Sequence, residues 1–186
     1  AEDWLLLVYK AVGPGTAWLA QRGKGEALDL LTGLGRGFDP HAAGERPLLM
    51  GGGAGLPPLY RLAKELTALG KKPRLVMGFA TREDVFYREE FAELLPVTVC
   101  TEDGGEGLHG RVTDDPVREE DTGLFACGPL PMLRALSALP LPGQMSLEER
   151  MACGFGACMG CTIMTRSGPR RVCAEGPVFP KEELLW

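Results

Sequence analysis

The chain has 186 residues, of which 45% are hydrophobic and 24% charged, so it can bury the core of one large domain or two small ones. Its formal net charge of −5 argues against a nucleic-acid partner, because phosphate binding requires a basic face. No stretch reaches the roughly 18–20 apolar residues of a membrane span, and the acidic start with its short apolar run is not a signal peptide. We therefore expect a cytoplasmic protein without a membrane contact, in which clustered cysteines more often bind metal than form disulfides.

Residues 1–43 predict short β-strands and little else. The stretch 3–11 is apolar enough for a strand, a Gly-Pro-Gly turn follows, and 25–39 offers a second short strand ending in a glycine-punctuated loop. Two or three strands do not make a stable sheet alone. We expect this region to be the tail of a domain, and Ala1 in place of an initiator Met agrees with a trimmed chain or a fragment.

Residues 44–142 alternate between strands and helices. The pattern predicts buried strands at 46–52, 73–80, 96–103 and 123–128, and helices at 56–70, 82–95 and 130–139. Strands separated by helices predict an α/β fold with a doubly wound parallel sheet. Residues 143–186 hold four of the six cysteines and are expected to form a small third domain.

A glycine-rich turn lies between the first of these strands and the first helix. The glycines Gly51, Gly52, Gly53 and Gly55 would let the backbone approach a diphosphate, and the free N–H groups of a helix N-terminus favour an anion. Pro58 takes the place of the third glycine of the dinucleotide fingerprint, so the motif is a variant. Because such turns also occur without a ligand, the position between strand and helix is what favours a nucleotide site.

A second nucleotide signal is Cys127–Gly128–Pro129, between the fourth strand and the third helix. Ligands of open α/β sheets bind beyond the carboxyl ends of the strands, so a cofactor ring would lie against backbone at Gly128 and Pro129. Taken alone, Cys127 is better explained as a small buried hydrophobe than as a reactive thiol, and Cys100 as a packing residue.

The last cysteines follow the spacing C-x4-C-x2-C-x11-C, at Cys153, Cys158, Cys161 and Cys173. The first three are spaced as in plant-type two-iron ferredoxins, where a fourth cysteine follows further along the chain. Small residues between the first three cysteines leave room for a cluster and free backbone N–H groups to face its sulfurs. Structural zinc usually uses two separated Cys-x2–4-Cys knuckles, and disulfides need an oxidising compartment, so we favour a [2Fe–2S] cluster over both.

Five stretches together resemble one family: MGGGAGLPPLYRLAKEL, GFATREDVFYREEF, ACGPLPML, ERMACGFGACMGCTI and RRVCAEGPVF. The family is that of the electron-transfer subunits of NAD-dependent, B-type dihydroorotate dehydrogenase, within the ferredoxin–NADP reductase superfamily. The resemblance implies an FAD-binding β-barrel, an NAD-binding α/β domain and a C-terminal [2Fe–2S] module. It makes the N-terminal strands remnants of a barrel that is mostly missing, because the family's Arg-Pro-x-Ser motif has no counterpart here.

The resemblance also assigns cofactor contacts. LVYKAVGPGT is similar to the family's strand followed by G-x-G-T, which implies FAD contacts from Val8, Tyr9, Lys10, Gly15 and Thr16. NAD(H) would lie between the Gly51–Gly55 turn and Cys127–Gly128–Pro129.

A nicotinamide exchanges two electrons as a hydride, whereas a two-iron cluster carries one, so a flavin is needed between them. The resemblance implies a path from dihydroorotate through the FMN of a separate catalytic subunit, the cluster and FAD to NAD⁺, in pyrimidine (UMP) biosynthesis and within a heterotetramer. The orotate chemistry then lies in the partner, and no residue of this chain acts as acid or base. After the second strand, Arg82 would suit the 2′-phosphate of NADP and Glu83 and Asp84 a ribose; the resemblance favours NAD.

Three other functions remain open from the residues. One is a subunit of an NADPH–ferredoxin-type oxidoreductase or sulfide dehydrogenase of similar build, with a different partner and nucleotide. Another is a zinc-stapled nucleotide-binding module without redox activity, which would be colourless. The third is a ferredoxin domain fused to an inert α/β scaffold. For the favoured function, we expect the partner to bind around Met151–Met159.

Overall fold

The computed structural model describes residues 5–186 of the chain. It divides into two compact units, Ala1–Gly33 and Leu34–Trp186, and each unit is described by itself. The predicted strand at 3–11 begins with two residues that lie outside the described part. In the part of the chain that the structure describes, no helix is long and apolar enough to cross a membrane.

The first unit holds one helix, α1 (Pro14–Ala20), and no strand among its described residues. The Thr16 hydroxyl accepts hydrogen bonds from the backbone N–H groups of Val12 and Gly13, which fixes the start of this helix. The strands predicted at 3–11 and 25–39 are therefore wrong within the described residues, and the predicted turn is the start of a helix. A strand needs a neighbour for its backbone groups, whereas a helix pairs its own.

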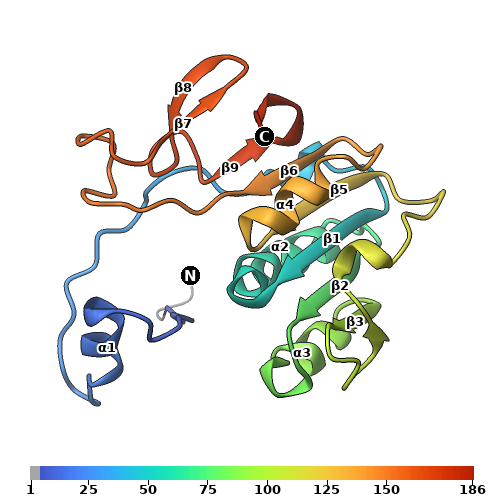
Figure 1. Ribbon diagram of the computed structural model, residues 1–186, viewed down its shortest axis with the longest axis horizontal. Coiled ribbons are helices and arrows are strands. Elements are labelled where there is room, and N and C mark those ends of the chain that lie inside the picture. Colours follow the sequence, from blue (N-terminus) through green and yellow to red (C-terminus); the bar gives the residue numbers. More distant parts are fainter. Residues whose placement is uncertain (1–4) are drawn as a thin grey trace. The chain divides into compact units, whose positions relative to one another are not determined.

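The second unit is built on a seven-stranded sheet in the order β4-β3-β2-β1-β5-β6-β9 (Figure 1). All neighbouring pairs are parallel except β6 with β9. The strands are β1 (Pro47–Gly52), β2 (Arg74–Phe79), β3 (Val97–Thr101), β4 (Leu108–His109), β5 (Gly123–Cys127), β6 (Gly143–Ser146) and β9 (Val178–Pro180). The predicted parallel α/β sheet is confirmed, and β4, β6 and β9 are additions to it.

The side chains of the central strands feed two hydrophobic cores, one on each face of the sheet. Leu48 and Met50 belong to one core and Leu49 to the other, because successive side chains of a strand point to opposite faces. One core is completed by helices α2 (Leu56–Ala68) and α3 (Arg88–Ala92). The other includes α4 (Leu130–Leu136) and residues of the last forty, so the cysteine-bearing segment packs on the sheet.

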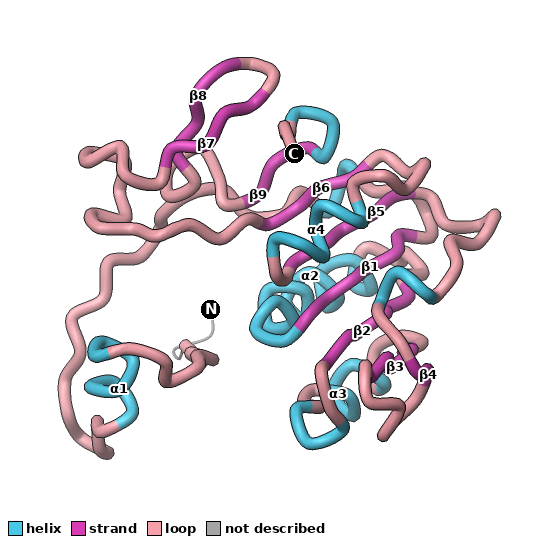
Figure 2. Tube along the Cα trace, viewed as in Figure 1, coloured by secondary structure: helices cyan, strands magenta, loops and turns pink. Residues whose placement is uncertain are grey.

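Helices α2 and α4 lie where the sequence predicts helices, at 56–70 and 130–139, whereas the helix predicted at 82–95 is shortened (Figure 2). Prolines occupy the first turn of α2, and Gly70 with φ of +76° follows its end, both as expected. The helix predicted at 82–95 is reduced to a 3₁₀ turn (Arg82–Asp84) and α3. Between them Tyr87 adopts φ of +61° while its ring stacks on Tyr60, with centroids 5.3 Å apart. Aromatic packing here outweighs helix propensity.

The cysteine-bearing segment contributes a second, two-stranded sheet, made of β7 (Thr162–Thr165) and β8 (Gly168–Arg171). We call this antiparallel pair the cysteine hairpin, and residues 151–161 before it the cysteine loop. After the hairpin the chain returns to the large sheet as β9 and ends with a 3₁₀ turn (Lys181–Glu183). The 3₁₀ turns Pro40–Ala42, Gly53–Gly55 and Val112–Asp114 complete the elements of the described residues.

Candidate functional site

The two glycine motifs meet at the carboxyl edge of the sheet. Strands β1 and β5 are parallel neighbours with Gly51 opposite Cys127, so both motifs follow their strands at the same level. A Cβ atom on Gly55 would stand 2.1 Å from the Cys127 carbonyl oxygen, and one on Gly52 would stand 3.1 Å from Cδ of Pro129. The backbones approach each other as closely as glycine allows. The two predicted halves of a nucleotide site are therefore brought together.

The thiols beside this edge are packing groups, as their surroundings predict. Cys127 is buried, and desolvation raises the pKa of its thiol to about 11, with Ser146 acting in the opposite sense. Cys100 is buried in β3, and desolvation followed by the charge of Asp115 raises the pKa of its thiol to about 11. Both thiols are therefore neutral at pH 7, and neither is poised as a nucleophile.

Arg82 follows β2 and has carboxylates in its neighbourhood. The Arg82 guanidinium lies 3.9 Å from a carboxylate oxygen of Glu106, which also pairs with Arg88 at 2.7 Å. Asp84 accepts a hydrogen bond from the Thr81 hydroxyl at 3.1 Å. Glu106 is thus shared between Arg82 and Arg88.

The four clustered cysteines are arranged as two pairs. The N–H of Cys158 donates to Sγ of Cys153 at 3.4 Å, and the N–H of Cys173 donates to Sγ of Cys161 at 3.4 Å. The second pair is built by the cysteine hairpin, because Val172 donates to the Cys161 carbonyl at 3.1 Å. The first pair lies on the cysteine loop, which turns through positive φ at Gly154 (+75°), Gly156 (+91°) and Met159 (+61°).

Hydrogen bonds shift the acidity of these thiols. Backbone N–H groups of Cys158 and Phe155 lower the pKa of Cys153 to about 6. The N–H of Cys173 lowers the pKa of Cys161. The pKa of Cys173 is raised, first by its hydrogen bond with Cys161, while the backbone N–H of Gly156 acts in the opposite sense. Each pair therefore contains one sulfur that is stabilised as a thiolate, the form that binds metal.

This donor set fits a two-iron cluster. Such a cluster is held by four thiolates, two on each iron, and its sulfurs accept backbone N–H groups. Two thiol pairs with N–H donors supply this, and the Gly160 N–H adds a contact to Sγ of Cys158 at 3.4 Å. Within residues 5–186, no three Cys, His, Asp or Glu side chains gather as ligands of one metal ion.

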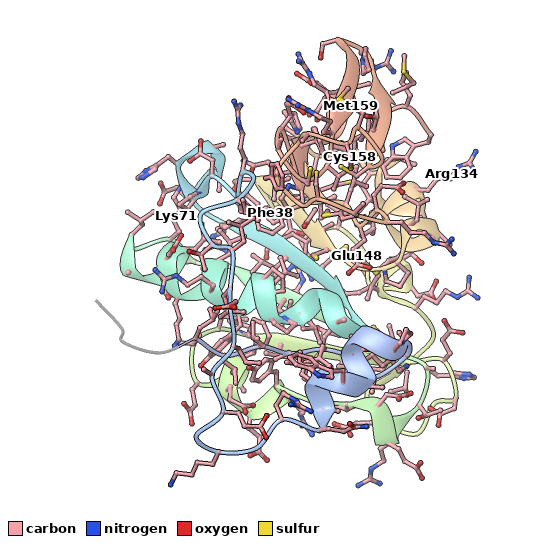
Figure 3. The ribbon with its side chains drawn as sticks, turned by 90° about the vertical axis from the view of Figure 1, so that its left-hand side faces the viewer. Phe38, Lys71, Arg134, Glu148, Cys158 and Met159 are labelled. Carbon is pink, nitrogen blue, oxygen red and sulfur yellow. The ribbon has the colours of Figure 1, made fainter. Side chains whose placement is uncertain are left out.

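The two pairs differ in burial. Cys161 and Cys173 are buried against the sheet, whereas Cys158 is exposed next to Met159 (Figure 3). Three apolar side chains of the cysteine loop are open to solvent, namely Met151, Phe155 and Met159. Exposed apolar side chains of this kind are typical of protein contacts.

The residues expected to contact a flavin all belong to the first unit. Val8, Tyr9 and Lys10 lie in an exposed irregular segment, and Gly15 and Thr16 lie in α1.

The cysteine region also contains a charged pair that sequence reasoning missed, Arg171 with Glu175. Their spacing of four residues just around Cys173 was the available signal.

Comparisons with known proteins agree on one family. A family profile described as the iron–sulfur cluster binding domain of dihydroorotate dehydrogenase B matches residues 148–185. The dihydroorotate dehydrogenase B (NAD(+)) electron transfer subunit of Bacillus caldolyticus is 48% identical over 188 residues, covering 96% of this chain and 73% of that protein. The proteins of the same name from Geobacillus kaustophilus (strain HTA426) and Bacillus mycoides (strain KBAB4) are 47% and 44% identical, each over 96% of this chain and 73% of their own length.

A solved structure is also similar over nearly the whole chain. It is that of an NADH-dependent reduced ferredoxin–NADP oxidoreductase, with a TM-score of 0.84 and 28% identity. The match covers 96% of this chain and 67% of the solved one.

Proposed function

The chain belongs to the family of electron-transfer subunits of NAD-dependent dihydroorotate dehydrogenase B, and on this premise we propose how its residues carry electrons. It is an oxidoreductase subunit of pyrimidine biosynthesis that uses a [2Fe–2S] cluster, FAD and NAD(H). The cluster supplies one-electron transfer, and the flavin converts single electrons into the pair that NAD⁺ takes up. The chain's own task is to hold these groups and to exclude competing reactions.

The observation that carries the proposal is the pairing of the four thiols. Cys153 with Cys158, and Cys161 with Cys173, would each bind one iron, because in each pair the backbone N–H of one cysteine donates to the sulfur of the other. The buried pair faces the sheet and the exposed pair faces outward. This orientation favours electron entry at the exposed side and exit toward the interior.

NAD(H) would bind at the carboxyl edge of the sheet. The Gly51, Gly52, Gly53 and Gly55 backbone would receive the diphosphate, while Cys127–Gly128–Pro129 would support the nicotinamide ring. The neutral Cys127 thiol leaves the ring without a charged neighbour on that side. The choice of NAD over NADP follows the family, because the relatives are named for NAD(+).

The FAD contacts proposed from the family resemblance are Val8, Tyr9, Lys10, Gly15 and Thr16. Three of these lie in a segment with no regular structure. The chain spans 73% of the length of its curated relatives. The family resemblance implies barrel strands that would pair with this segment and order it around the flavin.

The name of the relatives implies a catalytic partner subunit. We propose that the partner contains FMN, that it binds at Met151–Met159, and that the complex is a heterotetramer in the cytoplasm. The exposed apolar side chains of the cysteine loop support this location of the contact. The ferredoxin–NADP oxidoreductase is a less similar relative, at 28% identity, so we prefer the dihydroorotate system.

The test is electron transfer in the assembled complex. The chain is co-purified anaerobically with a B-type catalytic subunit, and NADH formation is followed after dihydroorotate is added. We expect NADH formation that disappears in Cys158→Ser and persists in Cys100→Ala. A complex that forms with its full cofactors and yet reduces no NAD⁺ would overturn the proposal.

A further inference from the structure

Arg171 lies at the end of the cysteine hairpin and contacts the cysteine loop through the Gly156 carbonyl. It is the last residue of β8 and pairs across the cysteine hairpin with Thr162, the neighbour of Cys161. Along the chain it precedes Cys173 by two residues. Its side chain is only partly exposed, at 31%, although it belongs to a surface hairpin.

The Arg171 guanidinium is fixed on two sides. Its Nε donates to Oε2 of Glu175 at 3.0 Å, its Nη2 donates to Oε1, and the backbone N–H of Arg171 donates to Oε2 at 2.7 Å. The remaining nitrogen, Nη1, donates to the carbonyl oxygen of Gly156 at 2.6 Å. Glu175 thus orients the guanidinium, and the free end reaches the cysteine loop.

Gly156 is the point of the cysteine loop that this contact controls. It is the only buried residue between Met151 and Gly160, it has φ of +91°, and a Cβ atom there would stand 3.0 Å from Nη1 of Arg171. The Gly156 carbonyl is held by the guanidinium, so the Arg171 side chain fixes the backbone at this turn.

An exposed ion pair four residues apart contributes little to stability and would need no further role. Arg171 and Glu175 differ from such a pair because the guanidinium also bonds a backbone carbonyl 15 residues away. That third bond joins the part of the cysteine loop with Cys153 and Cys158 to the cysteine hairpin, which lies between Cys161 and Cys173 in the chain.

We propose that Arg171 is a positioning residue for the cluster: it ties the two ligand-bearing segments together through the Gly156 carbonyl, and its charge, balanced by Glu175, sets the reduction potential. The inference rests on the proposed cysteine ligands. Net charge and hydrogen bonding around the sulfurs are the means by which proteins tune such clusters.

The sign of each effect follows from the charge of the reduced state. Reduction adds one negative charge to the cluster. Removing the nearby cation in Arg171→Gln leaves Glu175 unbalanced, disfavours that charge and lowers the potential. Removing the anion in Glu175→Gln leaves Arg171 unbalanced and raises the potential. Arg171→Lys keeps the cation and restores the potential toward that of the wild type.

The experiment is an anaerobic redox titration of the purified, cluster-loaded protein, followed by its visible and EPR spectra, for these three variants. Arg170→Gln is the matched control, because it removes the same charge from the neighbouring, exposed residue of β8. A second measurement is the rate at which a chelator removes iron. We expect Arg171→Gln to lose iron roughly tenfold faster than Arg170→Gln, as for the loss of one charged hydrogen bond.

Potential shifts of opposite sign in Arg171→Gln and Glu175→Gln, with Arg170→Gln unchanged, would support the inference. If Arg171→Gln retains no cluster, Glu175→Gln still decides, since it is isosteric and leaves the donor to Gly156 in place. Unchanged potentials in a cluster-loaded Glu175→Gln would overturn the inference alone. A wild-type chain that binds no cluster would instead overturn the proposed function on which it rests.

Discussion

The large sheet and the cysteine loop, both in the second unit, hold their shapes in different ways. At the centre of the sheet, Leu48, Leu49 and Met50 are fully buried, and apolar burial fixes the backbone that faces the nucleotide. In the cysteine loop, only Gly156 and the last residue, Cys161, are buried, and the shape rests on hydrogen bonds to sulfur and on Arg171. The backbone of the proposed nucleotide site is therefore held by the cores of the sheet, whereas the loop depends on what its sulfurs bind.

Replacing one cysteine sulfur should remove the cluster from the cysteine loop and leave the sheet unchanged. In Cys158→Ser we expect essentially complete loss of bound iron and sulfide, because one iron loses a thiolate ligand. Far-UV circular dichroism and NADH affinity should stay close to the wild type, since the sheet has its own cores. The matched control is Cys100→Ala, a buried cysteine in β3 that should keep the full cluster. A stable, stoichiometric cluster in Cys158→Ser would show that the ligand assignment is wrong.

The stability of the sheet should depend on a buried ion pair. Nε and Nη2 of Arg74 donate to the two carboxylate oxygens of Asp121 at 2.9 and 2.6 Å, and Nη1 donates to Asp115 at 2.5 Å. Removing the charge in Asp121→Asn should cost about 3 kcal/mol of unfolding free energy, measured by denaturant titration. Glu120→Gln, next to the exposed Arg46, is the control and should cost less than about 1 kcal/mol.

The ion pair of Arg74 and Asp121 also predicts how the unfolding free energy changes at acid pH. Burial acts to raise the pKa of Asp121, but the hydrogen bond and charge of Arg74 outweigh it and the pKa is lowered. A carboxyl with a lowered folded pKa stabilises the protein above its ordinary pKa of about 4 and loses this contribution as the pH falls through the folded value. Asp121→Asn should therefore flatten the pH dependence of the unfolding free energy below about pH 4. An acid limb as steep as that of the wild type would contradict this.

A smaller effect is expected from a substitution in the glycine-rich turn at the carboxyl edge of the sheet, where NADH is proposed to bind. Gly55→Ala places a Cβ atom 2.1 Å from the Cys127 carbonyl oxygen, so one of the two motifs must move. We expect a loss of about 2 kcal/mol in unfolding free energy and roughly tenfold weaker NADH binding by fluorescence titration. Gly37→Ala meets no atom within 4 Å and serves as the control. Equal NADH affinity in both variants would show that the glycine turn does not contribute to NADH binding.

The smallest effect is expected on the surface of the cysteine loop. Phe155 is 58% exposed, so Phe155→Ala should change the unfolding free energy by less than about 0.5 kcal/mol. The Phe155→Ala variant should bind the catalytic subunit more weakly, as measured by calorimetry, because the Phe155 ring belongs to the proposed contact surface. Unaltered binding would place the partner elsewhere.

The sequence predicts elements whose signals are local. The apolar run of β1, the glycines after it and the prolines of α2 mark a strand, turn and helix without any knowledge of the fold. The cysteine spacing similarly marks a two-iron site. Strands β6 and β9 are four and three residues long and are defined only by their pairing, Met145 opposite Phe179, so no local pattern reveals them.

Errors arose where distant contacts decide the backbone. The N-terminal strands were predicted from apolar composition, yet none of the described residues of the first unit is buried. The third helix was predicted too long because stacking of Tyr87 on Tyr60 interrupts it. Arg171 was overlooked because its partner Gly156 lies on another segment, and a charged residue in a hairpin carries no signal of such a contact.

The most direct test of the central claim is the visible spectrum of the anaerobically purified protein, recorded before and after dithionite. The account predicts broad red-brown absorption that bleaches on reduction, together with a reduced-state EPR signal of one electron spin per four cysteines. Colourless protein that remains colourless after incubation with iron and sulfide, and that contains zinc, would contradict it.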